Sequence, residues 1–436
     1  MMLGRMPRRP APVVPPRPRN SRPARHGRPS PVQLRLRWGA LALALAVVLG
    51  AIYCGVQLAR SVPPIAVSEV LPARLVASGD PPALPLPPQG AALVEVAGLG
   101  ELGGVRATQP LPLASVTKLM TALVVLHDHP LSPGQQGPVI TITAPEAAAY
   151  SADLALDDSV AKVATGERLT EFQALEALLV PSADNVADIL ATWDAGTVAA
   201  FVSRMNAQAE KLGLHQTHYA DPAGLDPESA GSAADMVRLA SYVMAEPVLR
   251  QIVAMPQVTL PVAGTVYNYD YDLGHDGIIG IKTGSTPQAG GNFVFAASKD
   301  VAGKSFMVIG AVLNQGGQQP LQSALDLAKQ LSVAAFSDIR TVTLLPEGTK
   351  VLSLGAPWGQ RAAAVTTRAV SALGIPGEVA TARVVLVPGS SKLRQTAPGQ
   401  QLATVKVSFP GGAASIPAVA AGRVAPASVS YRLGRI

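Results

Sequence analysis

The chain has 436 residues, of which 48% are hydrophobic and 15% charged, so it can form large cores and is not a wholly disordered protein. Its length predicts two domains with additional segments. The net charge of +6 is concentrated at one end, because eleven of the 35 basic residues lie in residues 1–37 or at Arg60. The rest of the chain contains 24 basic and 29 acidic residues. The basic charge therefore does not predict binding to nucleic acid.

The first 60 residues predict a membrane anchor. Residues 1–37 form an Arg- and Pro-rich tail that we expect to be disordered in the cytoplasm. Residues 38–60 are the expected transmembrane segment, because 39–59 is an uncharged run of 21 residues and a bilayer crossing needs ~20. The preceding arginines favour a cytoplasmic N-terminus and an extracytoplasmic remainder. A cleaved signal peptide is the alternative, and the length of the apolar run favours the retained anchor.

Residues 61–90 are rich in proline and predict an extended linker. Mixed helix and strand patterns then predict an α+β domain over 91–337. Helical patterns lie at 113–128, 167–180, 185–193, 196–213 and 322–339. Strand patterns that predict an antiparallel meander lie at 258–264, 277–285, 291–298 and 304–314.

Residues 338–436 predict a small all-β domain. Short β-type segments alternate there with Gly and Pro turns, at 341–354, 361–370, 382–389 and 400–409. This region carries no compact set of reactive residues. A role as a spacer or in partner docking is therefore only a default expectation.

Three short motifs carry the candidate chemistry: Ser115-Val-Thr-Lys118, Ser182-Ala-Asp184 and Lys282-Thr283-Gly284. On a helix that starts at Ser115, Lys118 lies on the same face, so a neutral amine there can take the serine proton. Burial beside a second cation, Lys282, favours the neutral amine. An ammonium and a hydroxyl at a strand edge suit a terminal carboxylate, and Ser182 can relay a proton to a leaving amine. Each motif alone is weak evidence, but their order in an exported chain is strong evidence.

Together these motifs resemble the serine-lysine, Ser-x-Asn and Lys-Thr-Gly set of penicillin-binding proteins. With the runs ASVTKLMTALVVL, GERLTEFQALEALLVPSADN and GIKTGSTPQAGGNFVFAA, the chain over 91–337 resembles the serine D-Ala-D-Ala carboxypeptidases of low molecular mass. This resemblance implies a β-lactamase/transpeptidase-like fold: a five-stranded antiparallel sheet packed by helices, plus a helical subdomain. It implies the D-Ala-D-Ala end of peptidoglycan stem peptides as substrate, β-lactams as inhibitors, and no metal or other cofactor. The oligomeric state stays open.

The resemblance also implies a role for each candidate residue. The catalytic residues would be Ser115 as the acylated nucleophile, Lys118 as the general base and Ser182 as an assisting hydroxyl. The substrate-binding residues would be Lys282, Thr283, Asp184 and Ser285. Among these, Lys282 would hold the substrate carboxylate, and the backbone N–H groups of Ser115 and Ser285 would form the oxyanion hole.

One position departs from the family pattern. Asp184 stands where the second motif has asparagine, and Asn185 follows it. A carboxylate near Lys118 favours the ammonium form, which opposes the role of a base. Asn185 would point ~100° away on a helix, so it is a poor substitute. Three alternatives stay open: a β-lactamase, a D,D-endopeptidase, and a non-catalytic envelope protein that binds peptidoglycan.

Overall fold

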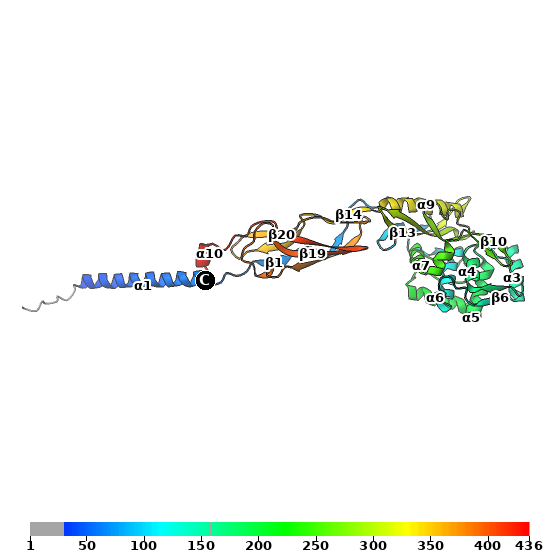
Figure 1. The fold of residues 1–436 in the computed structure, drawn as a ribbon, viewed down its shortest axis with the longest axis horizontal. Helices are drawn as coiled ribbons and strands as arrows, with labels where there is room; N and C mark the ends of the chain where they lie inside the picture. The colour runs from blue at the N-terminus through cyan, green and yellow to red at the C-terminus, as the bar shows by residue number, and fades with distance from the viewer. Residues whose placement is uncertain (1–29, 157, 436) are drawn as a thin grey trace, which may run out of the picture. The chain divides into compact units, whose positions relative to one another are not determined.

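The computed structural model describes residues 30–156 and 158–435, so residues 1–29 of the expected tail lie outside the described residues. The first helix, α1 (Pro31–Ala59), is 29 residues long and is apolar enough to span a membrane (Figure 1). It begins seven residues before the expected boundary at 38. Ser30 and Gln33 form a capping box and Pro31 occupies the first turn, so the local sequence starts the helix there.

A short C-terminal helix, α10 (Val429–Leu433), packs against the end of α1. The Arg435 guanidinium donates to the carbonyls of Gln57 (3.0 Å), Arg60 (3.1 Å) and Ser61 (2.9 Å). These bonds satisfy carbonyls that a helix C-terminus leaves without partners. The last residues of the expected β domain (338–436) therefore belong to the same compact unit as the anchor, which comprises the chain up to Pro63 and from Pro426.

The second unit, Pro64–Ala425, contains a seven-stranded sheet of order β1-β15-β16-β20-β19-β18-β2. Both edge strands, β1 (Ala66–Glu69) and β2 (Arg74–Val76), come from the segment 61–90 that the proline content predicted as a free linker. These strands are too short to show a two-residue period between their prolines, and edge positions tolerate nearby proline. The inner strands are β15 (Lys350–Gly355), β16 (Arg361–Thr366), β18 (Val379–Leu386), β19 (Gln401–Phe409) and β20 (Gly412–Ala420). The pair β14 (Arg340–Leu345) and β17 (Val370–Gly374) and the turn η2 (Ser390–Lys392) complete this part.

A five-stranded antiparallel sheet of order β11-β12-β13-β3-β4 forms the centre of the other part. The fold class predicted from the sequence is confirmed. The strands are β3 (Ala91–Val96), β4 (Gly100–Val105), β11 (Ile278–Thr286), β12 (Gly290–Val301) and β13 (Lys304–Gln315). The predicted strand at 258–264 lies outside this sheet, in the hairpin of β9 (Gln257–Leu260) and β10 (Gly264–Tyr267).

Alternate residues of these strands face two different cores. Phe293 and Phe295 pack with α9 (Pro320–Asp338), whereas Val294 and Ala296 pack with α7 (Ala233–Ala245) and the other helices. Figure 1 shows α9 and α7 on opposite sides of β13. In the described part of the chain, one face of the sheet therefore carries α9, and the other carries the helical subdomain.

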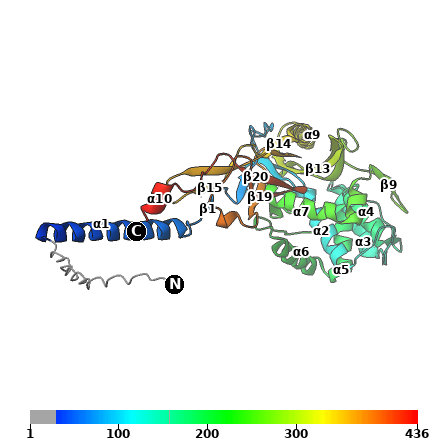
Figure 2. The ribbon, with the colours of Figure 1, turned by 60° about the vertical axis from the view of Figure 1, so that its left-hand side comes forward.

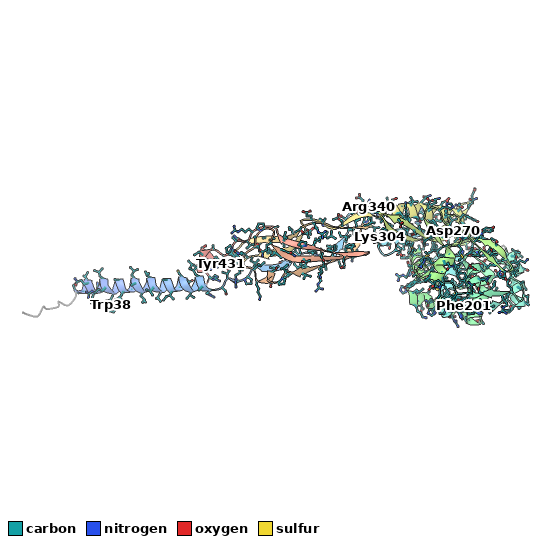
Figure 3. The ribbon with its side chains drawn as sticks, viewed as in Figure 1. Trp38, Phe201, Asp270, Lys304, Arg340 and Tyr431 are labelled. Atoms are coloured by element: carbon teal, nitrogen blue, oxygen red, sulfur yellow. The ribbon has the colours of Figure 1, made fainter. Side chains whose placement is uncertain are left out.

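The helical subdomain surrounds α2 (Lys118–Asp128), eight of whose eleven residues are buried. Figure 2 shows α2 among the other helices, and Phe201, labelled in Figure 3, is one of the fully buried side chains of the same core. A helix that is apolar on almost all sides belongs in the middle of a core, so its first residue, Lys118, is buried. The other helices are η1 (Ala114–Thr117), α3 (Ala144–Ala155), α4 (Glu171–Leu179), α5 (Asp184–Ala195), α6 (Val198–Leu212) and α8 (Pro247–Val253). Two short strand pairs lie in the connections between these helices: β5 (Leu111–Pro112) with β8 (Ala230–Gly231), and β6 (Val139–Thr141) with β7 (Arg168–Thr170).

Candidate active site

Ser115 lies in the turn η1, which leads directly into α2. The preceding residue, Ala114, has a φ of 48°, a left-handed conformation that residues other than glycine seldom adopt. The buried side chain of Asn292 holds this turn by donating to the carbonyls of Pro112 and Leu113, each at 2.9 Å. Strained residues persist where the surroundings fix them, and they are common at catalytic sites.

Lys118 is fully buried and its ammonium group has three partners. Its Nζ lies 2.9 Å from Oγ of Ser115, 2.5 Å from Oδ1 of Asp184 and 2.9 Å from the carbonyl oxygen of Ala223. An ammonium group has three N–H donors, so three acceptors match its charged form. In this state Lys118 donates to Ser115 and forms a buried ion pair with Asp184.

Asp184, and not Asn185, is the neighbour of Lys118. The second oxygen of Asp184 accepts from the backbone N–H of Ser159 at 3.0 Å, so both carboxylate oxygens are engaged. The Asn185 amide points elsewhere: it donates to the carbonyl of Ala161 at 2.9 Å and accepts from its N–H at 3.1 Å. The site therefore contains a carboxylate where a neutral amide was expected from the family pattern.

Ser182 lies two residues before α5, which starts at Asp184. Its φ of 64° is a second left-handed conformation at the site. Its hydroxyl is buried and has no hydrogen-bond partner among residues 30–156 and 158–435. Ser182, Ser115, Thr283 and Ser285 line one cavity of about 160 Å³. An unsatisfied hydroxyl beside the nucleophile is available to a bound substrate.

The strand β11 also lines this cavity; among the described residues it pairs with β12 and is an edge strand of the sheet. A Cβ at Gly284 would lie 3.0 Å from the backbone N of Ser115 and 3.1 Å from the carbonyl oxygen of Leu113. Glycine therefore permits the close approach of β11 to η1. A free edge is the place where an extended peptide can add as a strand.

A loop from Asp221 to Leu225 supplies the third partner of Lys118. Oδ2 of Asp221 accepts from the N–H groups of Gly224 (2.9 Å) and Leu225 (2.7 Å), which fixes the loop and presents the Ala223 carbonyl. Gly224 has a φ of 87°, and a Cβ there would lie 1.8 Å from the carbonyl oxygen of Ala114. The sequence signal for this loop is the Asp-Pro-Ala-Gly turn, which by itself does not indicate contact with a lysine 105 residues away.

A family model described as D-alanyl-D-alanine carboxypeptidase matches residues 102–316. A D-alanyl-D-alanine carboxypeptidase of Mycobacterium tuberculosis is 32% identical over 213 residues, with 47% of this chain and 69% of that relative covered. This chain belongs to the D-alanyl-D-alanine carboxypeptidase family. A D-alanyl-D-alanine endopeptidase of Pseudomonas aeruginosa is also 32% identical, with 43% of this chain and 59% of the relative covered. The crystal structure of a Streptomyces DD-transpeptidase matches with a TM-score of 0.50 and 28% identity, covering 58% of this chain and 100% of that one.

Family membership makes this chain a serine D,D-peptidase of the penicillin-binding-protein type. The resemblance to the serine D-Ala-D-Ala carboxypeptidases, inferred from the sequence motifs, is confirmed. The structure brings Ser115, Ser182, Thr283 and Ser285 to one cavity, with Lys118 bonded to Ser115. The role of each residue stays a prediction.

Lys282 is 2% exposed and is not among the residues that line this cavity. Its ammonium donates to the carbonyl of Thr283 at 3.1 Å. Burial, and then the charge of Lys118, lower the pKa of Lys282 to about 7, and the carboxylates of Asp184 and Asp270 act in the opposite direction. The charge that would hold a substrate carboxylate is therefore lost as the pH rises above neutral.

Asp270 also acts electrostatically on Lys282, and no sequence pattern indicated this interaction. It is buried in the connection between β10 and β11 (Figure 3), and burial raises its pKa to about 7. Its Oδ1 accepts from the N–H of Asp272 at 3.1 Å, whereas its Oδ2 is buried with no partner in the described part of the chain. In the sequence it stands in an alternating Tyr-Asp run that is typical of an exposed loop.

Asp270→Asn is expected to move the alkaline limit of activity to lower pH. The carboxylate raises the pKa of Lys282, so its loss leaves Lys282 charged over a narrower range. The measurement is the second-order rate of acylation by a labelled penicillin between pH 5 and 9. Asp276→Asn is the matched control, because Asp276 pairs with Lys329 at the surface of the same connection. An unchanged alkaline limit in Asp270→Asn would contradict the link to Lys282.

Proposed function

We propose that this protein is a membrane-anchored, serine-type D-Ala-D-Ala carboxypeptidase that trims peptidoglycan stem peptides and is inhibited by β-lactams. The observation that carries the proposal is the 2.9 Å contact between Ser115 Oγ and Lys118 Nζ at the free edge of β11. The arginines before α1 favour a cytoplasmic N-terminus with the catalytic domain outside.

The first step proposed is acylation of Ser115. Its Oγ attacks the carbonyl carbon between the two D-alanines while neutral Lys118 takes the hydroxyl proton. The backbone N–H groups of Ser115 and Ser285 stabilise the oxyanion that forms. Ser182 passes a proton to the nitrogen of the departing D-alanine, and Lys282 with Thr283 holds its carboxylate. Water then hydrolyses the ester and restores Ser115.

The test is covalent labelling of the full-length protein in detergent with a fluorescent penicillin, followed by mass spectrometry of the modified peptide. We expect one adduct on Ser115 and none in Ser115→Ala. Folded protein that forms no adduct, or an adduct at another residue, would contradict the proposal. Release of D-alanine from a pentapeptide, compared with cleavage of a cross-linked dimer, then separates a carboxypeptidase from an endopeptidase.

A second candidate is a protein that binds peptidoglycan without cleaving it. The buried pair of Lys118 with Asp184 favours this alternative, because it holds the expected base in its protonated form. It predicts binding of a D-Ala-D-Ala peptide with no acylation of Ser115. Rapid turnover of a chromogenic β-lactam would instead identify a β-lactamase.

A further inference from the structure

Asn292 is a fully buried polar residue in β12, within the run Gly-Gly-Asn-Phe-Val-Phe-Ala-Ala. Side chains alternate along a strand, so Asn292 faces the same side as Val294, which packs with the helical subdomain. A buried amide needs hydrogen-bond partners. Those of Asn292 lie in two different places, the neighbouring strand β13 and the turn before Ser115.

A β-bulge between β12 and β13 orients the Asn292 side chain. The register of the two strands shifts between Gly291 and Phe293, so two residues of β13 lie opposite Asn292 alone. One of the two, Asn314, has a φ of 57°, and its backbone N–H donates to Oδ1 of Asn292 at 2.7 Å. Bulges often lie beside active sites, where they re-aim a side chain. With Oδ1 held on β13, the amide nitrogen is directed to the turn that carries Ser115.

Asn292 also lies directly opposite β11. Its partner in the β11–β12 register is Gly284, and the next pair joins Ser285 to Gly291. A Cβ at Gly284 would lie 3.1 Å from the carbonyl oxygen of Leu113, the same oxygen that accepts from the Asn292 amide at 2.9 Å. One residue of β12 therefore restrains two parts of the site. Its backbone belongs to the ladder that holds β11, and its side chain holds the turn before Ser115.

We propose that Asn292 is a positioning residue that sets the spacing between the backbone N–H groups of Ser115 and Ser285. These two groups are the proposed oxyanion hole, so the inference rests on the proposed function. Such donors are effective only when they are fixed, before the reaction, at about 2.7–3.1 Å from the place where the oxyanion forms. Asn292 acts through the turn and the strand, and not by contact with the reacting atoms.

Asn292→Asp tests this role, because it keeps the shape of the side chain and removes both N–H donors. The carboxylate repels the carbonyl oxygens of Pro112 and Leu113, so the turn moves relative to β11. We expect the second-order rate of penicillin acylation at pH 8 to fall by at least about 100-fold, the effect of losing one oxyanion-hole donor. Measurements at rising penicillin concentrations should place the loss in the acylation step, with pre-covalent binding changed by less than about threefold.

The pH dependence of this variant separates positioning from a general loss of packing. Burial favours the protonated form of the introduced carboxyl group, whose O–H can donate to one of the two carbonyls. The ratio of variant to unchanged acylation rates should therefore rise by at least about tenfold between pH 8 and pH 5. This ratio removes the titration of Lys282 and of every other group that both proteins share. A ratio that stays constant with pH would overturn the proposal.

Asn206→Asp is the matched control, because the half-buried Asn206 of α6 makes the same set of bonds. It donates to the carbonyls of Val202 (3.1 Å) and Tyr219 (2.8 Å) and accepts from the N–H of Tyr219 (3.0 Å). We expect a lower Tm in both variants. Acylation should stay close to normal in Asn206→Asp, with no recovery at low pH. If acylation falls equally in the two variants, Asn292 has only a structural role and the proposal is wrong.

Amide hydrogen exchange tests the same contact without acylation. In the full-length protein in detergent, the peptide covering residues 111–118 should exchange faster in Asn292→Asp than in Asn206→Asp or the unchanged protein. Equal exchange in all three would overturn the proposal, even if acylation falls. Failure of the unchanged protein to react with penicillin would instead contradict the proposed function alone, since exchange still reports whether Asn292 holds the turn.

Discussion

Asp184→Asn is expected to accelerate acylation of Ser115. Asparagine keeps the shape of the side chain and can still accept from Lys118, but it removes the buried counter-ion of the ammonium group. A buried charge without a partner is costly, so Lys118 shifts toward its neutral form, which can act as a base. A positioned general base contributes about 10²–10⁴-fold to a rate, and we expect a rate increase of at least about tenfold. The measurement is the second-order rate of penicillin acylation at pH 7.

Asp188→Asn is the matched control for this experiment. Asp188 lies one turn further along α5, so the replacement removes the same charge from the same helix without removing a bond to Lys118. We expect a much smaller change in its acylation rate. If Asp184→Asn acylates more slowly than the unchanged protein, Asp184 assists the proton transfer, and the interpretation of it as an obstacle is wrong.

Gly224→Ala is expected to reduce acylation by at least about 100-fold, since misplacement of catalytic groups by about 1 Å has effects of that size. The new Cβ would lie 1.8 Å from the Ala114 carbonyl oxygen, so the loop or the Ser115 turn must move. Either movement disturbs the bond from Lys118 to the Ala223 carbonyl. We also expect a lower Tm, because the φ of 87° at this position disfavours alanine.

Gly98→Ala separates the backbone cost of alanine at a positive φ from the steric clash that a Cβ makes at Gly224. Gly98 has a φ of 77°, but nothing lies within 4 Å of a Cβ placed there. Its replacement therefore measures the backbone cost alone, about 1 kcal/mol, with normal acylation. If Gly224→Ala acylates as fast as Gly98→Ala, the Asp221–Leu225 loop does not position Lys118 for acylation.

The parts of the site that the sequence predicts are those set by local geometry. Ser115 and Lys118 are three residues apart, so a helix or a tight turn brings them together wherever it lies. The contacts of Asn292, Ala223 and Asp270 depend on chain segments that meet only in the folded protein, and none of the three stands in a local pattern that indicates it. The ion pair of Lys118 with Asp184 likewise lies in the protein interior, and the spacing of the sequence motifs does not indicate this burial.

In the fold, too, the elements that the sequence predicts are those with a local sequence pattern. The long amphipathic or apolar helices α2, α4 and α6 lie close to their predicted positions, because their periodicity extends over several turns. The strands β1 and β2 were missed, because three or four residues between prolines carry too little pattern to distinguish a strand from a linker. The start of α1 at Pro31 depends on a capping box that the hydropathy of the chain does not register.

The origin of β1 and β2 has a mechanical consequence. The strands β1 and β2 form one sheet with β15, β16, β18, β19 and β20, so the peptidase part is inserted between two segments of the β part. The connections to the anchor unit, at Pro63–Pro64 and Ala425–Pro426, both enter this β part. A pulling force between the anchor and the seven-stranded sheet therefore has a covalent route that bypasses the strands and helices around Ser115. Tension applied at either junction would therefore reach the seven-stranded sheet before it reached the segments around Ser115.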